Sequence, residues 1–389
     1  MSAPSLASGR WPEEFLESMR LVKDPEADEM AATVFNSGGH HALIHMTRAL
    51  EVWEDPIPDS LPENMRDFFA RPVEYPDFFD PEKIKIAEDL FVSYGPVSVV
   101  VLLMNAVPHF FTNPAGARSF YLAKIFNPKS LRNRMLQVPQ FVVDITERGG
   151  LAQTPDPQSP YGIRKGRGII TVQKLRVIHA GIRILLKLPQ RNPEDNWDLK
   201  TLGEPISQCE MAEAVMCFCV CTIDGLKKAG LIQSPEQQEA TLNAWKSVGF
   251  LLGLQNELQP DNIEEAYALR DAIYNRTAKS TREASVLIRE MLHIMKSIVP
   301  ILFRQFPAGT MRYQLGKEVA DLLDVPNPRF LMLIMTMLKP FWENEKGFAK
   351  IAKTLSPHLV RWLQEADKID DRFHLRLPAA LALKWGAHR

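Results

Sequence analysis

Apolar residues recur at helical spacing along almost the whole chain, and the alternation typical of strands is scarce. Apolar side chains three or four residues apart gather on one face of a helix, whereas a half-buried strand needs a period of two. The 29 prolines among 389 residues interrupt these runs and mark where helices end. The sequence therefore predicts an all-α protein whose helices are joined by connections rich in proline.

Several of the expected helices have recognisable ends. Ser234 precedes Pro235 and lies three residues before Gln237, an arrangement typical of a helix N-terminus. One long irregular stretch, residues 149–168, is expected either to cover a substrate entrance or to form a solvated insertion. We predict helices over residues 27–36, 40–53, 63–70, 81–103 with a break at Gly95-Pro96, 116–125, 129–147, 172–186, 207–229, 235–254, 263–275, 282–299, 328–338 and 347–365.

Composition excludes some classes of protein. Hydrophobic residues make up 46% and charged residues 24% of the chain, as is usual for globular proteins. The net charge of -1 gives no electrostatic case for nucleic acid as the main partner. The most apolar run, residues 97–107, is too short to span a bilayer and is expected to end at Pro108. We expect no transmembrane anchor and, since no signal peptide is visible, a cytoplasmic protein, with secretion open if the N-terminus is processed.

The four cysteines, Cys209, Cys217, Cys219 and Cys221, form no C-x-x-C pair and show no zinc-site spacing. Cys217, Cys219 and Cys221 fall within one five-residue stretch of an expected apolar helix. We expect buried free thiols in a reducing compartment.

Residues 176–183, RVIHAGIR, carry the most specific chemistry in the chain. Arg176 lies three residues before His179 and Arg183 four after it, so all three are expected on one helix face. An imidazole between two guanidiniums suits haem, with the imidazole on the iron and the arginines on the propionates. The alternatives are a packed core histidine and arginines held in structural salt bridges.

The same stretch resembles the haem-binding helix of the latex-clearing protein (rubber oxygenase) and MpaB-type oxygenase family. The likeness covers roughly residues 24 to 280, and its segments follow one another in the order the family has. The other segments are D-P-x-A-D at 24–28, P-D-S-L-P at 58–62 before Phe68-Phe69, an Arg-to-Phe element at 134–141, and W-x-x-V-G-x-x-L-G at 245–253 running into 257–261.

The resemblance implies a single catalytic domain with a globin-like, haem-binding helical core at residues 24–300. Residues 1–23 would be an N-terminal extension, and residues 301–389 a C-terminal helical extension packed on the domain. The implied protein is a haem b-dependent dioxygenase that cleaves a carbon–carbon double bond in a hydrophobic, isoprenoid-like small molecule or polymer, giving carbonyl products. Because C-x-x-C-H is absent, the haem would be non-covalent. The alternatives are a non-catalytic helical haem- or lipid-binding protein and a peroxidase-like haem enzyme.

The resemblance also implies roles for particular residues. His179 would be the iron ligand, and Arg176 and Arg183 would bind the haem. On the opposite side, the family pattern R-x-x-K-T is replaced here by Arg134, Gln137 and Val138. Glutamine can donate a hydrogen bond but is a poor iron ligand, and valine cannot hydrogen-bond through its side chain.

Histidines outside this helix are weaker candidates. With Arg134 and Gln137, His109 completes the catalytic candidates, as an acid or base lining the distal pocket; the alternative is a partly exposed histidine at the end of a loop. His41 and His45 share a helix face beside His40 and can hold a metal by geometry, but no H-E-x-x-H pattern supports this.

Overall fold

The computed structural model describes residues 9–51, 56–126, 130–299, 301, 304–329 and 331. For residues 124–126, 130–136, 297 and 298 it describes the backbone alone. The predicted helix over 347–365, most of that over 328–338, and most of the predicted C-terminal extension lie outside the described residues.

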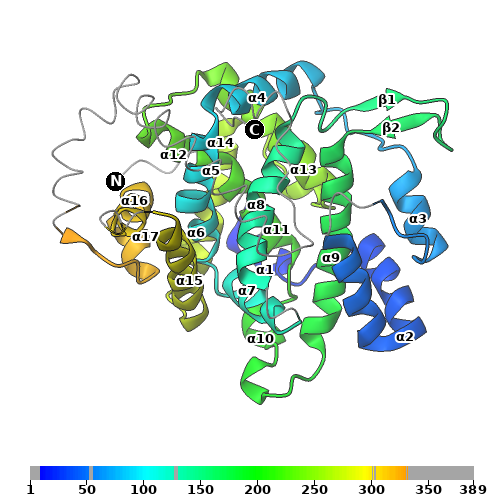
Figure 1. Ribbon diagram of the computed structural model, residues 1–389, viewed down its shortest axis with the longest axis horizontal. Helices are drawn as coiled ribbons and strands as arrows, with labels where there is room; N and C mark the ends of the chain where they lie inside the picture. The colour runs from blue at the N-terminus through cyan, green and yellow to red at the C-terminus, as the bar shows by residue number, and fades with distance from the viewer. Residues whose placement is uncertain are drawn as a thin grey trace.

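The described residues fold into an array of helices with one small hairpin at its edge (Figure 1). The α-helices of the first half are α1 (Glu13–Met19), α2 (Pro25–Glu51), α3 (Glu63–Ala70), α4 (Pro81–Tyr94), α5 (Pro96–Val101), α6 (Val107–Phe110), α7 (Pro114–Phe126), α8 (Ser130–Thr146) and α9 (Arg167–Lys187). Those of the second half are α10 (Leu199–Leu202), α11 (Gln208–Met216), α12 (Thr222–Lys228), α13 (Pro235–Leu251), α14 (Ile263–Thr277), α15 (Arg282–Ile298), α16 (Phe306–Leu315) and α17 (Lys317–Leu322). Two π-helical segments, η2 (Leu102–Ala106) and η4 (Cys217–Cys221), and two short 3-10 helices, η3 (Pro193–Asp195) and η5 (Asn256–Leu258), complete the list.

The all-α prediction is confirmed, and glycines set two of its predicted breaks. Gly39, at φ +64°, interrupts α2 between the two helices expected there. Gly95, also at φ +64°, separates α4 from α5, and the helices on either side meet at 92°. A residue other than glycine rarely adopts this left-handed backbone, so the chain turns where glycine allows it.

Two details differ from the sequence prediction. Residues 149–168 are not wholly irregular, because β1 (Gln153–Pro155) and β2 (Ile163–Lys165) pair as an antiparallel hairpin. Helix α9 then begins at Arg167, five residues before its predicted start. Gly168 lets its first turn approach α8 closely, since a Cβ there would lie 2.7 Å from the Cα of Ile145.

The apolar run was predicted to end at Pro108, but the helix continues past this proline. It passes through η2 and continues into α6, with Pro108 in its first turn. The N–H of Val107, just before it, donates to the carbonyl of Leu102 in the wider π-helical pattern, and Pro108 itself has no N–H to donate. Of the described helices, none is by itself long and apolar enough to cross a bilayer; the bent pair of 81–94 with 96–110 meets the length and composition criteria together.

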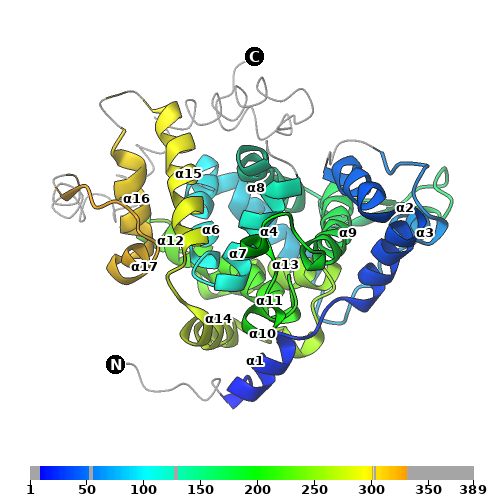
Figure 2. The same ribbon diagram turned by 90° about the horizontal axis from the view of Figure 1, so that it is seen from below.

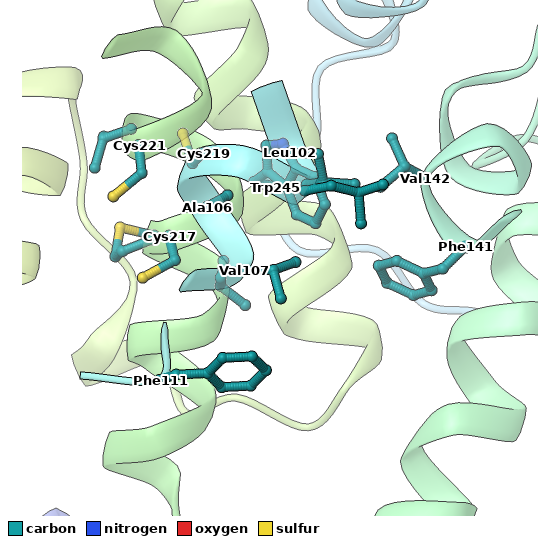
Figure 3. Packing of buried hydrophobic residues seen from close by; sticks show 14 of the residues in the cluster. Leu102, Ala106, Val107, Phe111, Phe141, Val142, Cys217, Cys219, Cys221 and Trp245 are labelled. Atoms are coloured by element: carbon teal, nitrogen blue, oxygen red, sulfur yellow. The ribbon is translucent and has the colours of Figure 1, made fainter. Parts of the chain in front are cut away.

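Helix α9 lies between two apolar clusters, with α2 and α3 on one side and α8 and α13 on the other (Figure 2). Its early residues Ile169 and Val172 pack in the larger cluster, and Val177 packs with Leu43 and Leu50 of α2 in the smaller one. Helix α9 is therefore a shared wall between the two halves of the core. The four cysteines are free and buried, as predicted, and Figure 3 shows three of them in the larger cluster.

Candidate active site

A cavity lies between α6, α7, α8, α9, α11 and α13. Its wall is mainly aliphatic and aromatic, and Figure 3 shows Phe141 of α8 and Phe111, which follows α6, pointing toward the same region. The cavity has a volume of about 210 Å³, counted as the space open to the centre of a water-sized molecule. One water needs roughly 10–15 Å³ of such space, so the cavity is far larger than a hydration site. It is the candidate site for an apolar ligand.

Helix α9 presents His179 to this cavity as part of an apolar stripe. Leu175, Ile178, His179 and Ile182 all line the cavity, and their spacing of three, one and three residues keeps them on one helix face. His179 is half-buried and is surrounded by aliphatic neighbours from its own helix. The imidazole is therefore the one nitrogen donor that α9 contributes to the cavity wall.

Arg176 and Arg183 lie beside His179, about 60° and about 40° around the axis of α9, but neither lines the cavity. Arg176 Nε and Nη2 donate to the two carboxylate oxygens of Asp24 at 2.6 and 2.9 Å, and Nη2 lies 2.9 Å from Glu26. Arg183, only 1% exposed, donates through Nε to Asp28 at 2.6 Å. Both guanidiniums thus have carboxylate partners within the chain, which is the salt-bridge alternative left open by the sequence.

Gly253, which belongs to a third motif, lies against the Asp24–Arg176 ion pair. It has φ +82°, and a Cβ on it would lie 2.5 Å from Asp24 Oδ2 and 2.7 Å from Arg176 Nε. The W-x-x-V-G-x-x-L-G segment therefore ends in a glycine that leaves room for the Asp24–Arg176 pair. Segments far apart in sequence, at 24–28, 176–183 and 245–253, meet here.

Helix α8 forms the wall that includes Gln137 and Val138. The structure therefore brings Gln137 and His179 to one cavity. Of Arg134 the structure describes only the backbone, one turn before Gln137 in the same helix. Pro139, one residue past Val138, lies inside α8 and removes a backbone donor there.

A buried carboxylate that sequence reasoning missed holds α8 against α9. Asp144 is 1% exposed and accepts hydrogen bonds from Arg167 Nε at 2.8 Å and from the Thr171 hydroxyl at 2.7 Å. Gln140, one turn earlier in α8, donates to it at 2.5 Å. Burial raises the pKa of Asp144, and Arg167 and these hydrogen bonds oppose that rise. No sequence spacing relates Asp144 to Arg167 and Thr171, so only the fold reveals the network.

The structure places His109 away from the cavity wall. His109 lies in α6 with Nδ1 3.0 Å from the backbone oxygen of Asn105. Its side chain is half-buried, which is nearer to the partly exposed histidine that the sequence left open than to a cavity-lining residue. The rings of His40 and His41 lie with centroids 4.0 Å apart and are tilted by 37°. Within the described ranges, no three His, Cys, Asp or Glu side chains are grouped as a metal site.

Two buried glutamates near the cavity were also missed. Glu210 is 3% exposed and lines the cavity; burial first and then the neighbouring Glu213 raise its pKa well above the usual range. Burial raises the pKa of Glu213 to about 8, although the Asn113 amide opposes this. In the sequence, Ser207 and Glu210 are a capping pair at the start of α11, so the pattern indicates only a helix end.

Ile206 next to this cap has a strained backbone. Its φ of +52° is in the left-handed region, where a β-branched residue is a clear outlier. Arg183 Nη1 donates to its carbonyl at 3.2 Å, and its own N–H donates to Glu210 Oε2 at 3.1 Å. Strain of this kind costs on the order of 1–3 kcal/mol and persists only where the surroundings hold it. Ile206 lines the cavity, so Arg183 supports the cavity wall indirectly.

The catalytic-domain model of the ER-bound oxygenase MpaB/B′ and rubber oxygenase family matches residues 126–339, more than half of the chain. The chain belongs to this family. The match includes both α8 and α9, and so the two cavity walls that carry Gln137 and His179. The sequence-based family assignment is confirmed.

Individual relatives agree with this assignment. The chain is 24% identical over 304 residues to the rubber oxygenase of Streptomyces sp. strain K30, covering 78% of this chain and 70% of that protein. It also resembles the solved structure of the latex clearing protein in its closed state, with a TM-score of 0.64 and 20% identity over 95% of this chain and 88% of that one. This second likeness shows that the two share the helical fold.

Proposed function

We propose that this protein binds haem b non-covalently and uses dioxygen to cleave a carbon–carbon double bond in a hydrophobic, isoprenoid-like substrate. The observation that carries the proposal is the position of His179. It is an imidazole in the wall of an otherwise mostly apolar cavity, inside a catalytic domain of an oxygenase family. Imidazole is the usual proximal donor to haem iron, and an apolar pocket suits both the porphyrin and a hydrocarbon.

The residues around His179 fit a haem in part. His179 on α9 would hold the iron, while Gln137 on α8 would offer an amide on another wall. Haem propionates would have to compete with Asp24, Glu26 and Asp28 for the two motif arginines. We therefore propose that Arg176 and Arg183 mainly position α9, with the Nη2 of Arg183, which has no hydrogen-bond partner among the described residues, left to meet a propionate.

When bound, haem would supply the chemistry of dioxygen, and the chain's own residues would arrange the substrate. The aromatic walls, including Phe141 and Trp245, hold an alkene by apolar contact and exclude water. In the overall reaction the double bond breaks, and each of its carbons receives one oxygen atom of dioxygen as a carbonyl. The atoms balance without an external reductant.

Turnover with isotopically labelled dioxygen tests the proposal. Protein expressed with an ample haem supply is incubated with squalene or with polyisoprene, and carbonyl fragments are analysed by mass spectrometry. We expect paired aldehyde and ketone fragments, each carrying one labelled oxygen, and none from His179→Ala. A protein that binds haem yet gives no fragments from any alkene would be the non-catalytic binding protein, which the Gln137-Val138 replacement favours. A protein with no haem absorption at all would contradict both.

A further inference from the structure

Two polar groups in the cavity wall have no hydrogen-bond partner among the described residues. They are Oε1 of Glu210 on α11 and Oγ of Ser119 on α7. Glu210 is 3% exposed and Ser119 is 7% exposed, so solvent does not satisfy them from outside the protein. A buried polar atom without a partner costs free energy, and in a cavity it is satisfied by a bound water or by a polar group of a ligand.

The local structure explains why only one oxygen of Glu210 faces the cavity. Glu210 Oε2 accepts the N–H of Ile206 at 3.1 Å, while the hydroxyl of Ser207 accepts the Glu210 N–H at 3.3 Å. The cap of α11 therefore uses Oε2 alone and leaves Oε1 in the cavity wall. A glutamate that served only as a helix cap could sit at the protein surface, where water would solvate the second oxygen.

The surroundings favour the neutral carboxylic acid over the carboxylate. Burial raises the pKa of Glu210 and the adjacent Glu213 raises it further, while the Ile206 N–H, the Ser207 hydroxyl and Arg183 of α9 oppose the rise. Since Oε2 accepts the N–H of Ile206, the acid proton belongs on Oε1, which then becomes a hydrogen-bond donor directed at the cavity.

We propose that the Glu210 carboxyl, with the Ser119 hydroxyl as a second anchor, binds the oxygen of a neutral, otherwise apolar ligand: an isoprenoid alcohol, aldehyde or ketone. An unmodified hydrocarbon leaves both groups without a partner. A carboxylate ligand is disfavoured, because its charge would be buried in a mostly apolar cavity that Glu51 also lines. The inference deepens the proposed function by naming a substrate class for this cavity, and it rests on that function only in taking the ligand as a substrate.

Binding of three matched probes tests the inference. Dissociation constants of the purified full-length protein are measured for farnesol, farnesene and farnesoic acid, which share a carbon skeleton. We expect farnesol to bind about 3- to 10-fold more tightly than farnesene, the effect of one good hydrogen bond, and farnesoic acid to bind most weakly. Glu210→Leu should abolish the preference for farnesol, whereas Glu210→Gln, whose amide still donates, should keep most of it.

Controls separate binding at Glu210 from a general effect of a buried acid. Glu88→Gln changes a buried acid in α4 whose pKa burial also raises but which does not line the cavity, and it should leave the farnesol preference unchanged. If Glu210→Leu does not fold, infrared difference spectra of the wild-type protein decide the matter. Farnesol, but not farnesene, should shift a protonated-carboxyl C=O band that is missing in Glu210→Gln.

Equal affinity of the wild-type protein for farnesol and farnesene would overturn the inference, as would a full preference in Glu210→Leu or a carboxyl band that farnesol does not move. Failure of the proposed function is a separate result. Oxygen-dependent cleavage of squalene without a farnesol preference contradicts only the inference about Glu210. A farnesol preference without cleavage of any alkene contradicts only the proposed activity.

Discussion

The two sides of helix α9 differ in how they accommodate buried carboxyl groups. Toward α2, Asp24 and Asp28 each meet a guanidinium of α9 at 2.6 Å. Across the cavity, Glu210 and Glu213 are similarly buried, but within the described part of the chain no ion pair joins either of them to a cation. One side is closed and held by charge. The other is an apolar cavity with Glu210 in its wall and Glu213 next to it, and burial raises the pKa of both carboxyl groups.

The comparison shows that one motif can serve two purposes. The charged residues of RVIHAGIR fix the helix to α2, and its histidine lines the cavity about 40–60° away around the helix axis. The ion pairs would then keep the imidazole in position. Variants on the two sides of α9 should consequently affect different properties. Those on the α2 side should change stability, and those on the cavity side should change ligand binding.

The largest expected effect is on the charged side. Arg183→Met leaves Asp28 without its closest cation and the Ile206 carbonyl without its donor. Breaking a buried pair by removing one partner costs about 3–5 kcal/mol of unfolding free energy. Denaturant unfolding measures the loss, and the exposed Arg191→Met should change stability by no more than about 0.5 kcal/mol. Equal stability of both variants would mean that the pair does not hold α9.

Gly253→Ala should give the next largest effect. Residues 253 and 162 both have left-handed glycines, at φ +82° and +69°, so alanine introduces similar backbone strain at each. Only at 253 does the new Cβ meet Asp24 and Arg176, whereas nothing lies within 4 Å at 162. Thermal or denaturant unfolding should show Gly253→Ala to be less stable than Gly162→Ala by about 1–3 kcal/mol. A difference near zero would show that the ion pair tolerates displacement.

The raised pKa of Glu213 should make the stability of the protein depend on pH. Glu213 has a pKa of about 8 when folded and an ordinary value near 4.5 when unfolded, so the folded state holds the extra proton between these values. Stability from this group is therefore fully present below about pH 4.5 and is lost as pH rises toward 8. Relative to the wild type, Glu213→Gln should gain roughly 1 kcal/mol for each pH unit in this window. A constant difference between pH 5 and 8 would mean that Glu213 is ionised in the folded protein.

The sequence predicted the helices well because helical periodicity and proline or glycine breaks are local signals. It also singled out His179 and Gln137, which the fold brings to one cavity. The partners of Arg176 and Arg183 could not be predicted in the same way. Asp24 and Asp28 lie about 150 residues earlier, and only tertiary packing decides which charges meet.

Two further features escaped prediction for related reasons. Glu210 resembles an ordinary helix cap in sequence, and only its burial beside a cavity gives it another possible use. His109 follows a proline in an apolar run, so its sequence does not distinguish a cavity-lining position from the one it takes beside the Asn105 backbone. In both cases the pattern fixes the local structure but not what the side chain faces.

Haem titration of His179→Ala tests the central claim, that His179 is the functional residue on the cavity side of α9, most directly. The wild-type protein and His109→Ala, whose histidine lies outside the cavity wall, should each take up one equivalent of haem with a Soret band typical of imidazole ligation. His179→Ala should keep the helical circular dichroism of the wild type and lose stoichiometric binding. Full haem occupancy with an unchanged spectrum in His179→Ala would contradict the account.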